Sequence, residues 1–291
     1  MEKFHSFDEI KKSLENGETD CKAIVNYYLQ NIQTKAHLNA FVEVYKDSAL
    51  EQAAKVDEKI ASGKSGRLAG MVIGIKDVLV YKDHEVNASS KILGGFVSQF
   101  TATAVQRLID EDAIIIGRLN CDEFGMGSSN ENSVHGKVLN AADETRVPGG
   151  SSGGSAVAVQ ANLCTVSLGT DTGGSVRQPA AFTGLVGIKP TYSRVSRWGL
   201  IAYASSFDTI GVFSRNVRDN ALVMEIMAGP DNFDSTASRK PVPHYSELLH
   251  FDKRAKVAFL TETLESPALQ PEIKENTLAV LDKLKQEGHT V

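Results

Sequence analysis

The chain has 291 residues, of which 42% are hydrophobic and 23% are charged, and its formal net charge is −5. This composition is typical of a well-packed globular protein with one large domain or two small ones. Acidic and basic residues are interspersed, and without a basic stripe nothing indicates that this chain by itself binds nucleic acid.

The beginning of the chain predicts three helices. Ser6 followed by Glu9 forms a capping box, which predicts a short helix directly after it. A second helix is expected after Asp20, and a third over residues 47–62. We therefore expect residues 1–65 to form an N-terminal helical segment packed on the core.

Beyond this segment, residues 66–291 are expected to form an α/β domain, because short apolar runs alternate there with helical patterns. The predicted strands are Gly70–Ile75, Ala113–Gly117, Cys164–Leu168, Leu185–Ile188 and Lys256–Leu260. The predicted helices are Thr103–Glu111, Ser155–Ala161, Asn216–Ala228 and Pro271–Glu287. This order indicates a central sheet that is largely parallel or mixed.

The cysteines and the hydropathy favour the cytoplasm. Cys21, Cys121 and Cys164 are spaced as neither a disulfide framework nor a metal site, so free thiols and no bound metal are expected. The N-terminus is too polar for a signal peptide, and no apolar run reaches the roughly 18 residues of a membrane span. We therefore expect no contact with a membrane.

Two glycine-serine segments, Pro148–Ser155 and Gly169–Pro179, are the densest chemical signal. Glycine is costly in regular structure, so these segments indicate tight turns or a close approach of the backbone. Successive backbone N–H groups in such turns bind an anion, which is the oxyanion of a hydrolase or the phosphate of a binding protein. A P-loop is disfavoured because no lysine opens the following helix.

The pattern Gly149-x-Ser151-x-Gly153 also matches the nucleophile elbow of serine hydrolases. That elbow requires an apolar strand directly before it, whereas residues 143–148 are polar. A Ser-His-Asp triad would also need a suitable histidine, and the downstream candidates are poorly placed: His244, His250 and His289. The match is therefore interpreted as a by-product of glycine richness.

Lys76 is unusual because it ends an apolar predicted strand, where active-site residues of α/β folds gather. An isolated lysine at a strand end more commonly extends to solvent. To act as a base, Lys76 must be neutral, and starting from the ordinary lysine pKa near 10.4 this costs roughly 4–5 kcal/mol at pH 7. We therefore expect its amine to be buried among serine hydroxyls.

Together, the Gly-Ile-Lys-Asp sequence at Lys76 and the two glycine-serine segments resemble the amidase-signature enzymes, both in motif and in spacing. The resemblance implies the amidase-signature fold, with a mixed central sheet flanked by helices on both faces. It also implies a Ser–cisSer–Lys triad that forms an acyl-enzyme. In that triad Ser175 attacks the amide, Ser151 follows a cis peptide bond and relays the proton, and neutral Lys76 accepts it.

The resemblance further assigns roles to the residues around this triad. Backbone N–H groups of Thr172, Gly173, Gly174 and Ser175 are expected to form the oxyanion hole. The residues expected to brace the site are Ser152, Asp171 and Arg177. Those expected to line the substrate site are Gly125, Met126 and Gly127.

Phe124–Ser133 and Gly187–Asp208 resemble a narrower branch of the family, the glutamine-hydrolysing subunits of tRNA-dependent amidotransferases. This implies glutamine as substrate and a partner B subunit that uses ammonia, ATP and Mg²⁺ to transamidate Glu-tRNA(Gln) or Asp-tRNA(Asn). A small C subunit would hold the two together. No cofactor is then expected on this chain, and charged tRNA is contacted only through the B subunit.

Two alternatives stay open, namely a stand-alone amidase of the same family and a non-catalytic scaffold that binds anions. Members of the family are usually several hundred residues long. We therefore expect the groups that recognise the glutamine α-amino and α-carboxylate groups, and part of the sheet, to lie beyond Val291.

Overall fold

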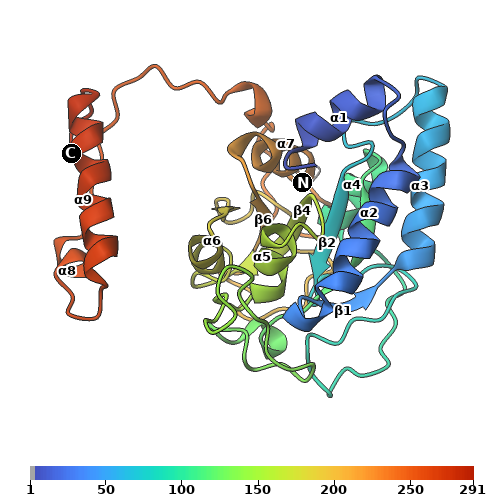
Figure 1. The fold of residues 1–291 in the computed structure, drawn as a ribbon, viewed down its shortest axis with the longest axis horizontal. Helices are drawn as coiled ribbons and strands as arrows, with labels where there is room; N and C mark the ends of the chain where they lie inside the picture. The colour runs from blue at the N-terminus through green and yellow to red at the C-terminus, as the bar shows by residue number, and fades with distance from the viewer. Residues whose placement is uncertain (1–3) are drawn as a thin grey trace. The chain divides into compact units, whose positions relative to one another are not determined.

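The computed structural model describes residues 4–291, and the chain divides into two units, Met1–Glu247 and Leu248–Val291. The described part of the first unit is built on a six-stranded sheet with the order β1-β3-β2-β4-β6-β5 (Figure 1). The strands are β1 Phe41–Val44, β2 Val72–Lys76, β3 Ile114–Leu119, β4 Val166–Asp171, β5 Val186–Ile188 and β6 Thr209–Ser214. The prediction of an α/β fold with a mixed sheet is confirmed, because β2 runs parallel to β3 and β4 while the other pairs are antiparallel.

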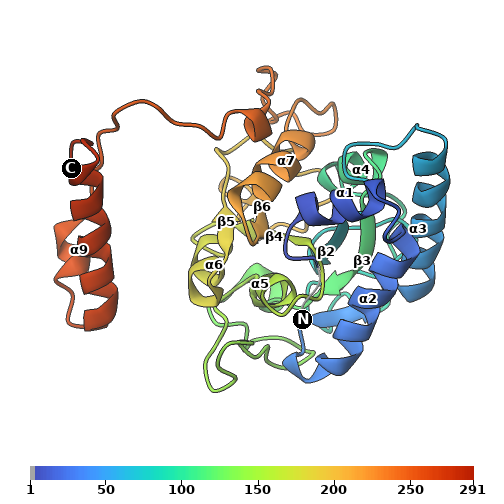
Figure 2. The same ribbon diagram turned by 45° about the horizontal axis from the view of Figure 1, so that its top comes forward.

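Helices cover this sheet. They are α1 Phe7–Glu15, α2 Cys21–Thr34, α3 Lys46–Ala61, α4 Thr103–Asp110, α5 Gly153–Gln160, α6 Arg177–Thr183 and α7 Val217–Met227. Short 3-10 turns occur at Ala36–Leu38, Glu123–Gly125 and Tyr245–Glu247. Helices α4 and α7 pack together on one side of the sheet and α5 lies on the other (Figure 2), as the amidase-signature fold implies.

Local sequence explains where these helices begin. Ser6 accepts a hydrogen bond from the Glu9 N–H at 3.3 Å, which confirms the predicted capping box. Asp20 and Asn216 cap α2 and α7 in the same way. A side chain that accepts one of the unpaired N–H groups of the first turn stabilises a helix by about 1 kcal/mol.

The three parallel strands are buried along their whole length, which matches their nearly continuous apolar sequences. The N-terminal helices contribute to the same core, since Phe7 and Tyr28 are buried in one cluster with the strand residues. The Tyr28 hydroxyl also lies 3.1 Å from that of Thr165, just before β4. The separate segment 1–65 stays a prediction, and its first three residues lie outside the described residues.

The second unit contains α8 Thr261–Leu264 and α9 Pro271–Gln286, so the helix predicted near Pro271 is confirmed. The predicted strand Lys256–Leu260 is wrong. Lys256 forms a single bridge with Thr290, and Phe259 and Leu260 are exposed. A strand needs a ladder of hydrogen bonds with a neighbour, and one bridge does not provide it. Across residues 4–291, no helix combines the length and apolar character needed to cross a membrane.

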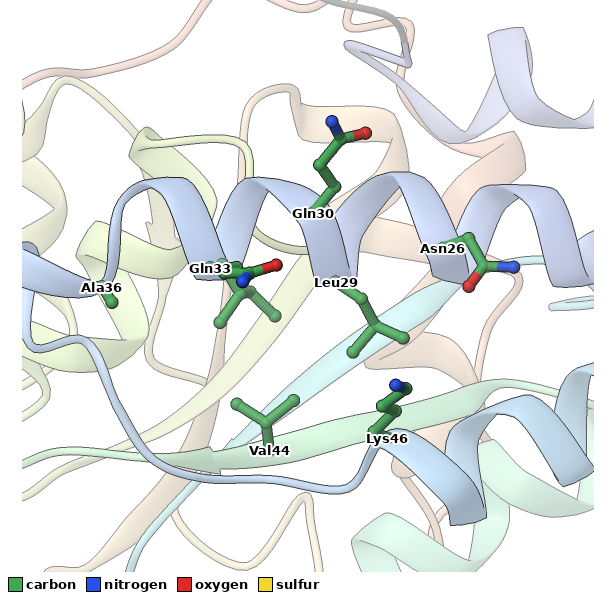
Figure 3. Close-up of a pocket in the computed structure, with 8 residues that line it drawn as sticks. Asn26, Leu29, Gln30, Gln33, Ala36, Val44 and Lys46 are labelled. Atoms are coloured by element: carbon green, nitrogen blue, oxygen red, sulfur yellow. The ribbon is translucent and has the colours of Figure 1, made fainter.

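A groove of about 630 Å³ lies between α2 and the junction of β1 and α3. Leu29 points from α2 toward Val44 and Lys46 on the other side (Figure 3). None of the predicted site residues lines this groove, so the candidate chemistry lies elsewhere.

Candidate active site

The predicted catalytic residues meet at one edge of the sheet. Strands β2 and β4 are parallel neighbours, so their carboxyl ends, Lys76 and Asp171, lie at the same edge. The first glycine-serine segment leads into α5 there, and the second connects β4 to α6. Sheet topology therefore brings together three segments that are far apart in the sequence.

Lys76 is fully buried, with 0% of the residue exposed. Its Nζ lies 2.7 Å from the Ser151 Oγ and 2.8 Å from the Thr170 Oγ1. Burial lowers the pKa of this amine from its usual value. In the described chain no carboxylate forms an ion pair with it, so hydroxyl groups alone hold the amine, as a general base requires.

Ser151 is held by its backbone as well as by the lysine. The peptide bond between Gly150 and Ser151 is cis. The Ser151 carbonyl accepts the Asp122 N–H at 3.0 Å, and the Asp122 carboxylate accepts the N–H groups of Asn130 and Asn132. A Cβ on Gly150 would collide with that carboxylate, so glycine is needed beside the serine.

Ser175 lines a pocket of about 340 Å³ that opens at this edge. The other lining residues are Gly125, Gly127, Ser128, Gly150, Thr172, Gly173, Gly174, Gln178 and Tyr203. A Cβ on Gly125 would lie 3.7 Å from the Ser151 Oγ and 3.9 Å from the Lys76 Nζ. The pocket therefore extends past Gly125, which has no side chain, to the buried pair of Lys76 and Ser151.

Not every predicted contact is formed. Within residues 4–291, no hydrogen bond joins the Ser175 hydroxyl to Ser151 or to Lys76. Met126, which was expected to line the site with its two glycine neighbours, is 64% exposed and lies outside the pocket lining. Gly125 and Gly127 do line it.

Asp171 holds the turn that carries Ser175. Its carboxylate accepts the N–H groups of Gly174, Val176 and Arg177, and it pairs with the Arg177 guanidinium through both oxygens at 2.9 and 3.0 Å. Burial alone would raise the pKa of Asp171, but the guanidinium and these backbone amides lower it below its ordinary value. The expected bracing pair is therefore present as a geometric feature.

Ser152 braces the same region from the other side. Its hydroxyl donates to the Thr170 carbonyl at 3.2 Å and accepts the Thr170 N–H at 3.3 Å. Its own N–H donates to the Ser175 carbonyl at 3.3 Å. These bonds tie the first glycine-serine segment to the end of β4 and to the turn that follows.

The backbone amides of this turn are not equivalent. Gly174 donates its N–H to Asp171 at 2.9 Å, so this amide is already engaged. For Thr172, Gly173 and Ser175, no acceptor among the described residues takes the N–H. These three amides are therefore the ones free to bind an anion in the pocket, whereas Gly174 was expected to contribute as well.

Three further residues of the site were not singled out from the sequence. Thr170 is the second hydroxyl that contacts Lys76. Gln178 accepts the Gly150 N–H at 2.9 Å and donates to the Ser128 carbonyl at 3.0 Å. Asp208 accepts the Thr172 hydroxyl. Thr170 and Gln178 stand within the second glycine-serine segment, which is the one signal that pointed to them.

Metal binding has no obvious place in the described part of the chain, since no group of three or more His, Cys, Asp and Glu side chains is arranged to share an ion.

Comparison with known proteins identifies the family of this chain. A model of the amidase family matches residues 23–291. The chain is 46% identical over 285 residues to the A subunit of the glutamyl-tRNA(Gln) amidotransferase of Chlorobium phaeobacteroides (strain BS1), which covers 97% of this chain and 59% of that protein. It is 50% identical over 247 residues to the corresponding A subunit of Chlorobaculum parvum, covering 84% of this chain and 51% of that protein. The chain thus spans between half and three fifths of these relatives.

Solved structures show the same fold. The native peptide amidase of Stenotrophomonas maltophilia superposes with a TM-score of 0.88 at 32% identity, covering 98% of this chain and 61% of that chain. The A subunit of the glutamyl-tRNA(Gln) amidotransferase of Thermotoga maritima gives a TM-score of 0.76 at 34% identity, covering 93% and 57%. Because the family model matches nearly the whole sequence and the fold agrees, the chain belongs to the amidase family.

Proposed function

We propose that this chain carries the glutamine-hydrolysing site of a tRNA-dependent amidotransferase, as its A subunit. The observation that carries the proposal is the fully buried Lys76, bonded to Ser151 beside a pocket lined by Ser175. Sequence identity to relatives that are named as amidotransferase A subunits supports the choice of glutamine over other amides.

In the proposed reaction, the Ser175 oxygen attacks the carbonyl carbon of the glutamine side-chain amide. Its proton passes to Ser151, whose own proton passes to the neutral Lys76 amine. The carbon–nitrogen bond then breaks, the proton returns through Ser151 to the leaving nitrogen, and ammonia is released. Water attacks the resulting ester of Ser175, with the same lysine as base, and glutamate leaves.

Two features of the site support this sequence of steps. A lysine whose pKa burial has lowered needs less energy to be neutral at physiological pH. The free N–H groups of Thr172, Gly173 and Ser175 line or border the pocket, where they can stabilise the negative charge of the tetrahedral intermediate. The Ser175–Ser151 hydrogen bond would form when substrate binds, since such bonds are often long in the free enzyme.

The partners follow from the same assignment. We infer that the ammonia passes to a B subunit, which uses ATP and Mg²⁺ to activate misacylated tRNA, and that a C subunit joins the two. On this view the acidic chain needs no nucleic-acid surface of its own, because tRNA contacts the B subunit.

The decisive experiment is an assay of ammonia release from glutamine, with the chain alone and assembled with B and C subunits and charged tRNA. We expect hydrolysis that depends on Ser175 and increases in the assembly. Rapid hydrolysis of other amides with no effect of the B and C subunits would contradict the proposal.

A stand-alone amidase is the second candidate, and one observation favours it. The fold superposes more closely on the peptide amidase than on the Thermotoga amidotransferase chain, with TM-scores of 0.88 and 0.76. Assaying C-terminal peptide amides in parallel with glutamine separates the two functions, because each predicts a different preferred substrate.

A further inference from the structure

Asp208 lies directly beyond the last paired residues of β4 and β6. In this antiparallel pair Asp171 is opposite Thr209, so the next residues along each chain, Thr172 and Asp208, come side by side. Asp208 is buried, with 3% exposed, and its carboxylate accepts the Thr172 hydroxyl at 2.5 Å. The register of the sheet therefore places a buried carboxylate against the first residue of the turn that carries Ser175.

The same carboxylate holds a second segment. It accepts the N–H of Tyr203 at 2.9 Å and that of Ala204 at 3.0 Å. Tyr203 and Thr172 both line the pocket. The Cβ of Tyr203 lies close to the position that a Cβ on Gly125 would occupy. The Asp208 side chain thus connects two parts of the same pocket, namely the turn that bears the free amides and the segment that carries Tyr203.

The turn needs such a connection because little else fixes its first half. Asp171 binds the amides of Gly174 and Val176, which lie in the second half. Gly173 is exposed, and a Cβ built on it would meet no atom within 4 Å, so no packing constrains the turn there. In this first half of the turn the N–H groups of Thr172 and Gly173 are free, and the bond from the Thr172 hydroxyl to Asp208 is what holds the backbone in place.

We propose that Asp208 is a positioning residue that acts through the Thr172 hydroxyl to aim the free amides of the turn at the reacting carbonyl oxygen, and that its other bonds set Tyr203 against the substrate. The inference rests on the proposed function, in that it assumes Ser175 to be the nucleophile. Asp208 itself touches no reacting atom. Its effect is geometric, and misplacing catalytic groups by about 1 Å can cost on the order of 100-fold in rate.

The test uses matched variants of the chain, assembled with the B and C subunits. Thr172→Val removes the hydroxyl at constant shape, Thr172→Ser keeps it, and Asp208→Asn removes the charge. Thr209→Val is the control, because Thr209 is also buried but its hydroxyl bonds the Phe207 carbonyl instead of the turn.

We expect Thr172→Val and Asp208→Asn each to lower kcat for glutamine by about 10- to 100-fold, which is no more than the roughly 100- to 1,000-fold loss caused by removing an oxyanion donor outright, because the amides are misplaced and not removed. The double variant should be no slower than Asp208→Asn alone, since both changes disrupt the same bond between Thr172 and Asp208. Thr172→Ser should restore most of the kcat that Thr172→Val loses, and Thr209→Val should stay close to the wild type. Asp208→Asn should also raise KM, because it frees Tyr203, whereas Thr172→Val should leave KM unchanged.

A second readout keeps the inference separate from the choice of substrate. The rate at which a fluorophosphonate probe labels Ser175 depends on the same amides and does not require glutamine. Wild-type labelling without glutamine hydrolysis would overturn the proposed function, and slower labelling of Thr172→Val and Asp208→Asn would then still support the positioning role. Equal labelling and kcat in wild type, Thr172→Val and Asp208→Asn would overturn the positioning role. A chain that takes no label at Ser175 would overturn both.

Discussion

The Lys76 amine lies 2.7 Å from the Ser151 hydroxyl, although 75 residues separate them in the sequence. The lysine is the last residue of a buried parallel strand, and the serine stands just before the helix that packs beside it. Because a buried titratable amine is bonded to a serine of the candidate site, substitutions of either residue should affect both stability and activity.

Ser175→Ala should abolish glutamine hydrolysis, lowering kcat by on the order of 10⁶ if the two serines and the lysine act as one unit. Folding should be unaffected, since the Ser175 side chain forms no hydrogen bond with any described residue. Ammonia release measures the effect, and circular dichroism checks the fold. Ser13→Ala in α1 serves as an unrelated control, and activity retained in Ser175→Ala would exclude this residue as nucleophile.

Lys76→Met should remove activity and also change how stability depends on pH. Because the folded pKa of Lys76 is lowered, the unfolded chain binds more protons between that value and the unfolded pKa near 10.4. The free energy of unfolding contributed by this group therefore rises with pH through that window. Urea denaturation across pH should show this rise in the wild type and a flatter profile in Lys76→Met.

The same pKa predicts the pH dependence of catalysis. The base is active only when neutral, so kcat/KM should increase with pH through the lowered pKa of Lys76 and then level off. The rise should lie below the usual titration range of a lysine. A rise centred at about pH 10 or above, where an ordinary lysine titrates, would show that burial does not prepare this amine as a base.

Asp171→Asn should destabilise the protein by about 1–3 kcal/mol, because it disrupts a buried acceptor of three backbone amides. The carboxylate has a lowered folded pKa, so its contribution is present above the unfolded value near 3.9 and is lost as the pH falls through the folded value. Denaturation at neutral and acidic pH measures both effects. Arg177→Leu is the milder comparison, since the guanidinium is largely exposed while the amide bonds survive.

Gly150→Ala should lower stability by about 1–3 kcal/mol, because the added Cβ would overlap the Asp122 carboxylate and the backbone behind it. Gly173→Ala is the matched control, since a Cβ there meets nothing within 4 Å. Thermal unfolding compares the two. Similar melting temperatures for both variants would mean that the contact at Gly150 relaxes at little cost.

Most helices were predictable because their signals are local. Capping residues, glycine stops and apolar spacing placed α1, α2, α4, α5, α7 and α9 within a few residues of their observed bounds. Helix α6 was missed because Pro179 stands inside it, but proline is tolerated in the first turn, where the N–H would lack a partner. Strands β1 and β6 were also missed, and both owe their structure to pairing with strands that are distant in sequence.

The strand predicted at Lys256–Leu260 is wrong for a related reason, because this segment has no neighbouring strand among the described residues to pair with beyond a single bridge. Its apolar residues have the composition of a strand, but composition does not supply a partner. Local pattern predicts a strand only to the extent that a neighbour is present to complete its hydrogen bonds.

The sequence by itself determined which residues are the candidates for catalysis, because Lys76, Ser151 and Ser175 stand in short motifs whose residue types and spacing are recognisable along the chain. Only the tertiary structure decided which amides of the turn are free. It also decided that the Thr170 hydroxyl contacts the Lys76 amine and that the Asp208 carboxylate holds the Thr172 hydroxyl. Those contacts depend on the strand order β2-β4-β6 and on its register. Such long-range pairing follows from the packing of the whole core, which no local pattern records.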